Sequence, residues 1–467
     1  MPGRPGPHRP APVGRGGPVS AATPEQRRPA VLSGVAVPAL DAEALFDVTV
    51  EDGVFTRIEP SGTRRGDEPE LWPGYTETHA HIALPANFDD TAEDPRIIAL
   101  QYLYHGVTHV VDMFGYPMVA DAWEAGRAAS DLPYPELVHC GYAVTAMTNA
   151  AGLSGHGVEF PTPVYMLAVE ADLDQALRNN AERGATFLKV MFTDGTEQPG
   201  SKVRFSRLSE RVLRFTARIA AERGITAVID CNTLEETRWA YDCGFRLFAH
   251  TVRDRTLGDA EWKDLAGARF VSTLSGLRPM VMTADDFLAA YGREGFAETQ
   301  DVRNLDAVRG LEQPYGITYG LQETRTGALG DMRRNALAAL REGNLLVGTD
   351  SGNTGAYHGY SLLGELDLLR GDDPSLADAL RHQATVGGRR YFDELRGESG
   401  AAHPISVGAP ATYNLHAPGR PLSALPTATV VRGTPIDRDA VARAIAGLRA
   451  AAAAGTTTHD TKEGAAL

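Results

Sequence analysis

The chain has 467 residues, and 43% of them are hydrophobic, which is enough for a large buried core and excludes a fibrous or wholly disordered protein. Its 60 acidic and 45 basic side chains give a net charge of −15, which repels polyanions and argues against a nucleic-acid partner. With three cysteines and no run of 18 apolar residues, we expect neither a disulfide framework nor a membrane span, and we expect the protein in the cytoplasm.

The N-terminal part of the sequence predicts a tail and then a small sheet. Residues 1–29 are rich in proline, glycine and arginine and lack the apolar stretch of a secretory signal, so we expect a disordered tail. Gly53 supplies a turn within a set of three β-like runs, at 31–37, 45–50 and 54–58. These runs predict an antiparallel sheet.

The middle of the chain alternates short β-rich runs with segments of helical period, which is typical of βα units. One helix is predicted at 207–223, where the apolar residues have helical spacing and Gly224 ends the pattern. The long connections at 144–171 and 278–325 indicate lids or substrate loops. Eight strands predict a (β/α)8 barrel of the α/β class, with its chemistry at the strands' carboxyl ends; they are 75–79, 107–113, 136–140, 186–191, 226–230, 245–250, 269–272 and 345–349.

The C-terminal part predicts a return to the first sheet. Strand-like runs at 405–415 and 428–433 are expected to join it. Helical spacing begins at Asp437, with Gly455 as a plausible cap, and a frayed tail is expected beyond.

Several of the predicted barrel strands end in residue types that bind metals. The candidates in chain order are His79, His81, Lys189, His250 and Asp350. Taken singly each has an ordinary explanation: paired histidines can be structural, a lysine can extend its amine to the rim, and an aspartate can cap a turn. Their occurrence in order at successive strand ends instead points to a metal centre.

The sequence resembles the amidohydrolase superfamily, in its imidazolonepropionase-like and prolidase-like branch of metal hydrolases. The resemblance covers roughly residues 31–435 and is carried by the segments 73–81, 106–112, 184–191 and 347–352, and more weakly by 152–157 and 408–411. It implies a barrel beside a small composite β-sandwich built from both ends of the chain. The implied division is a tail at 1–29, sandwich segments at 30–73 and 401–435, a metal-dependent barrel at 74–400, and a helix with a tail at 436–467.

The resemblance also implies roles for the strand-end residues. His79 and His81 would bind one divalent cation, zinc being the leading choice, and a carbamylated Lys189 would bridge to a second. His250 would bind the second cation, and Asp350 would bind the first and handle the proton of the attacking water.

Asp230 departs from the family pattern. It ends the fifth strand, in the sequence Asp230-Cys231-Asn232, where the family carries a histidine. A carboxylate can also bind zinc but is a harder donor than imidazole, so Asp230 is predicted to be a replacement ligand that adds negative charge. Asn232 either contacts substrate or caps a turn.

The leading functional hypothesis is hydrolysis of an amide or cyclic amide by a metal-activated hydroxide, with catalytic roles for Asp350 and His250. One alternative is a cyclase that closes a benzoxazole-type ring from an aromatic ester or amide in secondary metabolism. Another is a binding protein with a degenerate metal site. The predicted partner is a small, aromatic substrate, and a homo-oligomer is expected. Substrate contacts are predicted for His156, Tyr116, Phe192, Asn232 and His358, although core packing or solvated loops would also explain these residues.

Overall fold

The computed structural model describes residues 29–84, 86, 92–150, 154–155, 164–195, 205–280, 289, 292–301, 322–398 and 400–456. Several predictions lie outside these residues. They are nearly all of the N-terminal tail, His156, most of the segment 278–325, and the C-terminal tail beyond residue 456.

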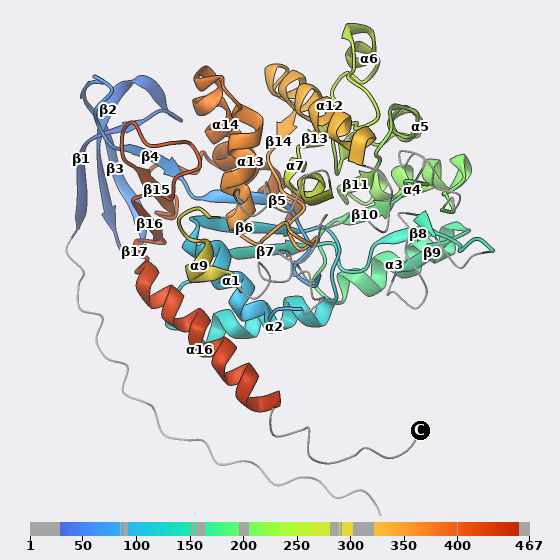
Figure 1. The fold of residues 1–467 in the computed structure, drawn as a ribbon, viewed down its shortest axis with the longest axis horizontal. Coiled ribbons are helices and arrows are strands. Elements are labelled where there is room, and N and C mark those ends of the chain that lie inside the picture. The colour runs from blue at the N-terminus through green and yellow to red at the C-terminus, as the bar shows by residue number, and fades with distance from the viewer. Residues whose placement is uncertain are drawn as a thin grey trace, which may run out of the picture.

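The two ends of the chain build one antiparallel sheet, as the sequence predicted. The order is β17-β16-β15-β4-β1-β2-β3, so the strands from beyond residue 412 form one side of the sheet and those from the first 73 residues the other, and only β1 and β4 run parallel. Figure 1 shows the early and late strands side by side. The turn between β2 and β3 places Asp52 and Gly53 at φ 49° and 81°, the positive values that tight hairpins need. The strands are β1 (Ala30–Val37), β2 (Asp41–Glu51), β3 (Val54–Thr63), β4 (Glu70–Pro73), β15 (Tyr413–His416), β16 (Ala428–Val431) and β17 (Thr434–Pro435).

All eight strands predicted for the middle of the chain are present, and together with β8 and β9 they form two parallel sheets. The strands β8 and β9 lie in the segment 144–171, which the sequence indicated to be a lid or substrate loop, so its two ends belong to the sheet instead. One sheet has the order β5-β6-β7 and the other β14-β13-β12-β11-β10-β8-β9. Strands β12 and β14 are shorter than predicted, with two residues each. The bounds are β5 (Tyr75–Ala80), β6 (Val107–Asp112), β7 (Glu136–His139), β8 (Val144–Ala146), β9 (Tyr165–Leu167), β10 (Leu188–Met191), β11 (Ala227–Asp230), β12 (Leu247–Phe248), β13 (Arg269–Val271) and β14 (Leu345–Leu346).

Among the described residues, backbone hydrogen bonds join the two parallel sheets at two places. Beyond β14, the Asp350 amide donates to the carbonyl of His79 at 2.8 Å, and the His81 amide donates to the carbonyl of Ser351 at 2.7 Å. Before β10, the Thr186 amide donates to the carbonyl of His139 in β7 at 3.1 Å. The fold is therefore mixed α/β, with the carboxyl ends of β5 and β14 drawn together.

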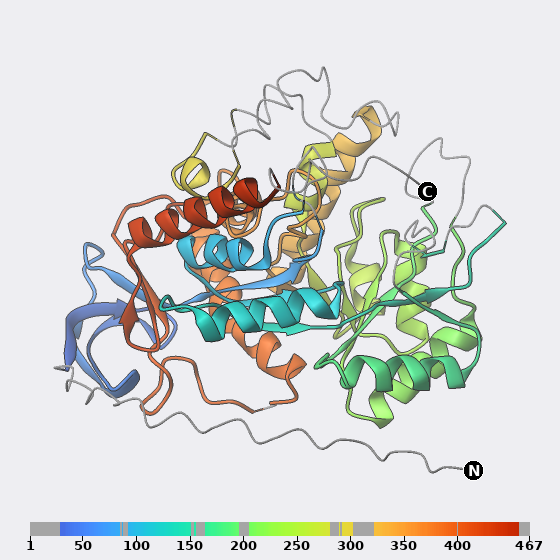
Figure 2. The ribbon, with the colours of Figure 1, turned by 90° about the horizontal axis from the view of Figure 1, so that it is seen from below.

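Helices cover the parallel strands and follow the predicted βα alternation. The predicted helix at 207–223 is α4, which starts at residue 210 because the Ser209 hydroxyl accepts from the Val212 amide at its first turn. The C-terminal helix α16 packs along α1, and Figure 2 shows the two side by side. The helices are α1 (Pro95–Tyr104), α2 (Pro117–Ala129), α3 (Glu170–Ala181), α4 (Glu210–Glu222), α5 (Leu234–Asp242), α6 (Asp259–Asp264), α7 (Leu274–Leu277), α9 (Phe296–Thr299), α12 (Gln322–Arg341), α13 (Tyr360–Arg370), α14 (Ala377–His382), α15 (Gly388–Leu395) and α16 (Arg438–Thr456).

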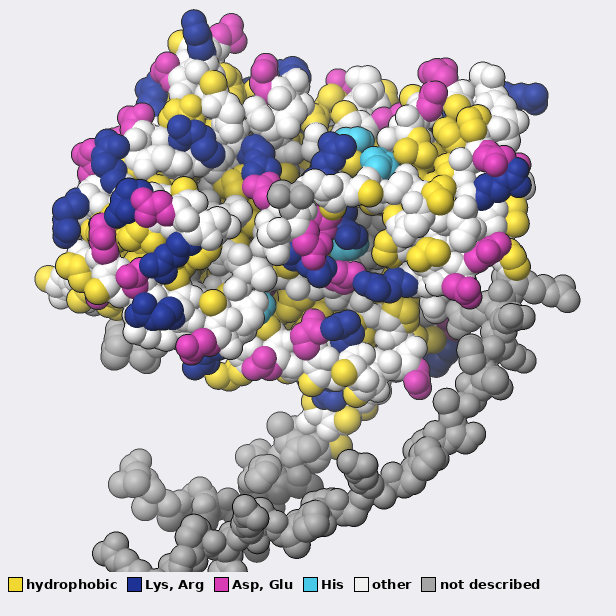
Figure 3. All heavy atoms as spheres, turned by 180° about the vertical axis from the view of Figure 1, so that it is seen from behind, with side chains coloured by type: hydrophobic (Ala, Val, Ile, Leu, Met, Phe, Trp, Pro, Cys, Tyr) yellow, Lys and Arg dark blue, Asp and Glu magenta, His cyan; other side chains and the backbone are white. Residues whose placement is uncertain are grey.

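The parallel strands lie in the core. Every residue of β5, β6 and β10 is buried, which is the pattern of strands covered on both faces. Among the described helices, none is both long enough and apolar enough to cross a membrane. Figure 3 shows acidic and basic side chains intermixed over one face of the molecule.

Candidate metal centre

Strand β5 places two histidines next to each other at its carboxyl end. Alternate residues of a strand lie on one face, so His79 and His81 project the same way as the chain leaves the sheet. Their Nε2 atoms are 3.2 Å apart, and the two side chains are almost completely buried.

Asp350 brings a third donor to the same point. Its Oδ1 lies 3.2 Å from Nε2 of His79 and 2.9 Å from Nε2 of His81. The residue has φ 61°, a conformation that costs energy in a residue with a side chain. The hydrogen bond of its amide to the carbonyl of His79 helps to hold that backbone in place.

The hydrogen bonds behind the histidines support the tautomer that metal binding needs. Nδ1 of His79 lies 2.9 Å from the carbonyl oxygen of Ala249, and Nδ1 of His81 lies 3.4 Å from that of Phe114. Each carbonyl can accept a hydrogen bond from Nδ1, and that tautomer leaves Nε2 with a lone pair for a cation. Burial, assisted by the charge of Lys189, lowers the pKa of His79 to about 3 and keeps the ring neutral.

In that tautomer three electron-pair donors face one another. Two imidazoles and one carboxylate are a donor set that suits a catalytic zinc ion. Among the described residues, His79, His81 and Asp350 meet the spacing needed to hold a metal ion.

The other predicted ligands form a second group against the first. Oδ2 of Asp230 lies 3.9 Å from Nζ of Lys189 and 3.3 Å from Nε2 of His250. The ring of His250 lies 4.9 Å from the ring of His79, measured between centroids. The structure thus brings together all six residues for which metal binding was predicted, although they fall into two distinct groups.

The predicted substrate residues have mixed locations. Tyr116 is half-buried, and its ring is 6.4 Å from that of Phe114, which in turn is 6.4 Å from that of His81. Phe192 is fully buried and packs edge-on against Trp239, so its described contacts are those of a core residue.

Two other predicted substrate residues, Asn232 and His358, lie in the interior. Asn232 is buried, and its backbone amide donates to Glu236 while its carbonyl accepts from the Arg253 amide. His358 is buried, with Nδ1 3.0 Å from the hydroxyl of Tyr102, which also lies 2.7 Å from the hydroxyl of Ser351.

Two buried carboxyls beside the centre were not predicted as site residues. Glu77 accepts hydrogen bonds from the amides of His79 and Thr349 and from the hydroxyl of Thr349. Burial raises its pKa to about 8 against the effect of those hydrogen bonds. Asp112, at the end of β6, accepts from the Ile82 amide, and burial raises its pKa to about 6. Two signals in the sequence could have identified these carboxyls. Glu77 has the same two-residue spacing to His79 that His79 has to His81, and Asp112 lies at a strand end.

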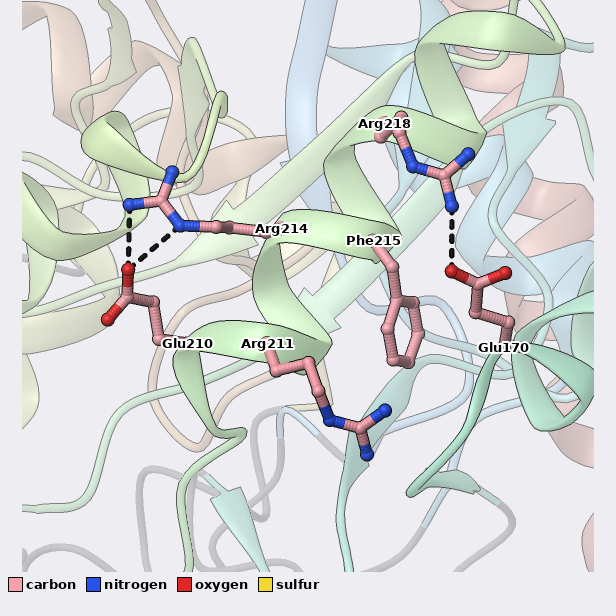
Figure 4. A pocket seen from close by; sticks show the side chains of 6 residues that line it. All are labelled: Glu170, Glu210, Arg211, Arg214, Phe215 and Arg218. Atoms are coloured by element: carbon pink, nitrogen blue, oxygen red, sulfur yellow. Dashed lines mark hydrogen bonds and ion pairs between the residues drawn. The ribbon is translucent and has the colours of Figure 1, made fainter.

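Two surface cavities lie away from this centre. One, of about 620 Å³, lies between α3 and α4, where Arg214 pairs with Glu210 and Arg218 pairs with Glu170 (Figure 4). Another, of about 440 Å³, is lined in part by His109. Neither is lined by a predicted metal ligand, and paired surface charges of this kind contribute little to stability.

Searches against protein-family models and against curated proteins give no match for this chain. Solved structures do match in fold. A bottromycin amidohydrolase is 20% identical with a TM-score of 0.63, covering 92% of this chain and 91% of its own. A prolidase complexed with N-methylphosphonate-L-proline is 17% identical with a TM-score of 0.58, and the match covers 88% of this chain and 100% of the prolidase. Ochratoxinase from A. niger is 16% identical with a TM-score of 0.55, and the match covers 84% of this chain and 91% of the ochratoxinase. The chain thus shares the fold of solved amidohydrolases and prolidases, as the resemblance predicted.

Proposed function

We propose that this chain, with the fold of solved amidohydrolases, is a metal-dependent hydrolase of amide C–N bonds. The observation that carries the proposal is the convergence of Nε2 of His79, Nε2 of His81 and Oδ1 of Asp350, three electron-pair donors within 3.2 Å of one another. With the ring protons on Nδ1, the two lone pairs and the carboxylate repel one another unless a cation lies between them.

The residues fit zinc, and the proposal requires one ion only. Bound by these three residues, zinc would lower the pKa of a water molecule and polarise the carbonyl of the substrate. Asp350 is the most exposed of the three, with 14% of its side chain accessible. We assign it the acceptance of the proton from the attacking water and its delivery to the leaving nitrogen.

We further infer that the eight predicted strands, among the ten of the two parallel sheets, close into a (β/α)8 barrel. Support comes from the parallel pairing of neighbours in chain order and from the hydrogen bonds that join β14 to β5 and β7 to the segment before β10. In this proposal the metal-dependent barrel spans 74–400, and segments 30–73 and 401–435 form the smaller β domain. The candidate centre then occupies the carboxyl ends of the strands, where barrel enzymes carry their chemistry.

An aromatic substrate group is supported by a row of rings that leads away from the centre. From His81 the row continues through Phe114 and Tyr116 to Tyr142 and Tyr165, with 5.7 to 6.4 Å between the centroids of successive rings. Its last three members are only half-buried, so their faces are partly available to a ligand. Aromatic faces of this kind favour stacking against another ring.

The proposal is tested by metal removal and by product analysis. The purified protein is assayed against N-acyl aromatic amino acids and aromatic anilides, with mass spectrometry to distinguish hydrolysis from ring closure. Chelation should abolish turnover and zinc should restore it. His81→Asn should lose both metal and turnover, whereas His382→Asn, a half-buried histidine on α14, is the matched control that should keep both.

Three results would count against the proposal. Turnover that persists in the fully chelated protein would remove the metal from the reaction. A cyclised product in place of two hydrolysis products would favour the cyclase. A chain that binds aromatic amides without turnover at full zinc content would favour a binding protein.

A further inference from the structure

We propose that Lys189 and Asp230 form a buried ion pair that stands in place of a second cation, so that the centre holds a single metal ion. The inference rests on the proposed function, because it presupposes the cation held by His79, His81 and Asp350. It differs from the two-cation centre with a carbamylated Lys189 that the sequence resemblance implied.

The first observation is that the second group, formed by Lys189, Asp230 and His250, already contains a positively charged side chain. Lys189 is 1% exposed and Asp230 is 2% exposed, and Nζ of the lysine lies 3.9 Å from Oδ2 of the aspartate. A buried lysine and a buried aspartate at this separation neutralise each other. The first group differs, because its converging atoms are all electron-pair donors and include no ammonium.

The second observation concerns His250. Its Nε2 lies 3.3 Å from Oδ2 of Asp230, and its Nδ1 lies 2.8 Å from the hydroxyl of Thr273. A carboxylate oxygen only accepts, so the favourable tautomer carries the proton on Nε2 and donates it to Asp230. The hydroxyl of Thr273 then donates to Nδ1. This is opposite to the tautomer that His79 needs in order to bind a cation, and it leaves His250 with no lone pair directed at one.

The third observation is the cost of the modification that a bridging role would need. To become a carbamate, the Lys189 ammonium must lose two protons while its nitrogen forms a bond to the carbon of CO2, so its charge changes from +1 to −1. Beside Asp230 the product would place two anions where an ion pair now stands. The attraction between the two side chains would become a repulsion that only an added cation could offset.

These observations give Asp230 a different role from the replacement ligand that the sequence predicted. Its carboxylate compensates Lys189 and accepts from His250, so it fixes both side chains beside the metal without binding the metal. A histidine at the same position could not neutralise the lysine, because neutral imidazole carries no negative charge.

The test counts metal ions and looks for the carbamate directly. The full chain is loaded with excess zinc in the presence of ¹³C-bicarbonate, freed of loose metal, and measured by inductively coupled plasma mass spectrometry and ¹³C NMR. One zinc per chain with no protein carbamate signal is expected. Two zinc ions per chain or a carbamate signal would overturn the inference while leaving the proposed function intact. A chain that binds no zinc would overturn both.

Two variants test what sets the number of zinc ions per chain. The double variant Lys189→Met with Asp230→Leu replaces the ion pair by apolar side chains, an exchange that buried pairs often tolerate, and it should still bind one zinc. Its loss of all zinc would show that the pair itself binds the metal. Asp230→His removes the negative charge and should raise the count toward two with a new carbamate signal. A count that stays at one in this variant would refute the assignment of Asp230 as the group that excludes the second cation.

Discussion

Glu77 joins the two strand ends that carry the candidate metal ligands, and its removal should be costly. Oε1 accepts from the amides of His79 and Thr349 at 3.1 and 2.9 Å, and Oε2 accepts from the Thr349 hydroxyl at 2.7 Å. In Glu77→Ala both amides lose a buried acceptor, at roughly 1–3 kcal/mol each. We therefore expect Glu77→Ala to lower the free energy of unfolding by about 4 kcal/mol, a large part of the ~5–15 kcal/mol typical of a folded protein.

Urea denaturation of the metal-free protein measures this loss without a contribution from metal binding. Glu77→Gln is the matched control, because its amide oxygen can accept from the same two N–H groups and resembles the neutral acid that a pKa of about 8 favours at pH 7. It should cost about 1 kcal/mol. In the zinc-bound protein Glu77→Ala should also weaken zinc binding by about 10- to 100-fold, as supporting residues of metal ligands do. A loss below about 1 kcal/mol in Glu77→Ala, or equal losses in both variants, would refute this role.

Tyr102→Phe removes the hydroxyl that contacts both Ser351 and His358, and should lower the free energy of unfolding by about 1–2 kcal/mol while zinc content is unchanged, as measured by urea denaturation and metal analysis. Tyr116→Ala should raise KM for aromatic amides by about tenfold and leave aliphatic ones unaffected, because a ring pair contributes about 0.5–1.5 kcal/mol; equal changes for both substrate classes would exclude stacking. Burial lowers the pKa of His105 to about 4, whereas an unfolded histidine binds a proton below about 6.5. The unfolded chain thus binds more protons between these values, and the free energy of unfolding should fall by up to about 1.4 kcal/mol per pH unit from this residue as pH drops from 6.5 to 4. Denaturation midpoints of the metal-free protein at several pH values, with His105→Asn showing a shallower slope, would check it.

The strands and the order of the ligand residues could be predicted because both depend on local pattern. Short β-rich runs between helical segments located eight of the ten parallel strands, and polar residues that follow such runs located His79, His81 and Asp350. The other two, β8 and β9, have three residues each and were too short to predict. The position of Asp230 was equally clear from its spacing to His250.

The contacts within the centre could not be predicted in the same way. Whether Asp230 faces a cation or Lys189 depends on rotamers and on the hydroxyl of Thr273, which is distant in the sequence. Phe192 was predicted to contact substrate, yet the described structure packs it against Trp239. The alternation of side chains between the two faces of a strand no longer predicts where a side chain points once the backbone has left the strand. Glu77 was overlooked because a carboxyl inside a strand resembles an ordinary polar residue until its three donors are visible.

The pairing of β4 with β15 has a consequence for how the protein is made. Strand β4 leads directly into β5, at whose carboxyl end the two histidines lie, and its neighbour β15 follows every candidate ligand in the chain. The nascent chain therefore contains its histidines before the sheet that supports them can be completed. Assembly of the candidate centre is expected to be a late event in synthesis.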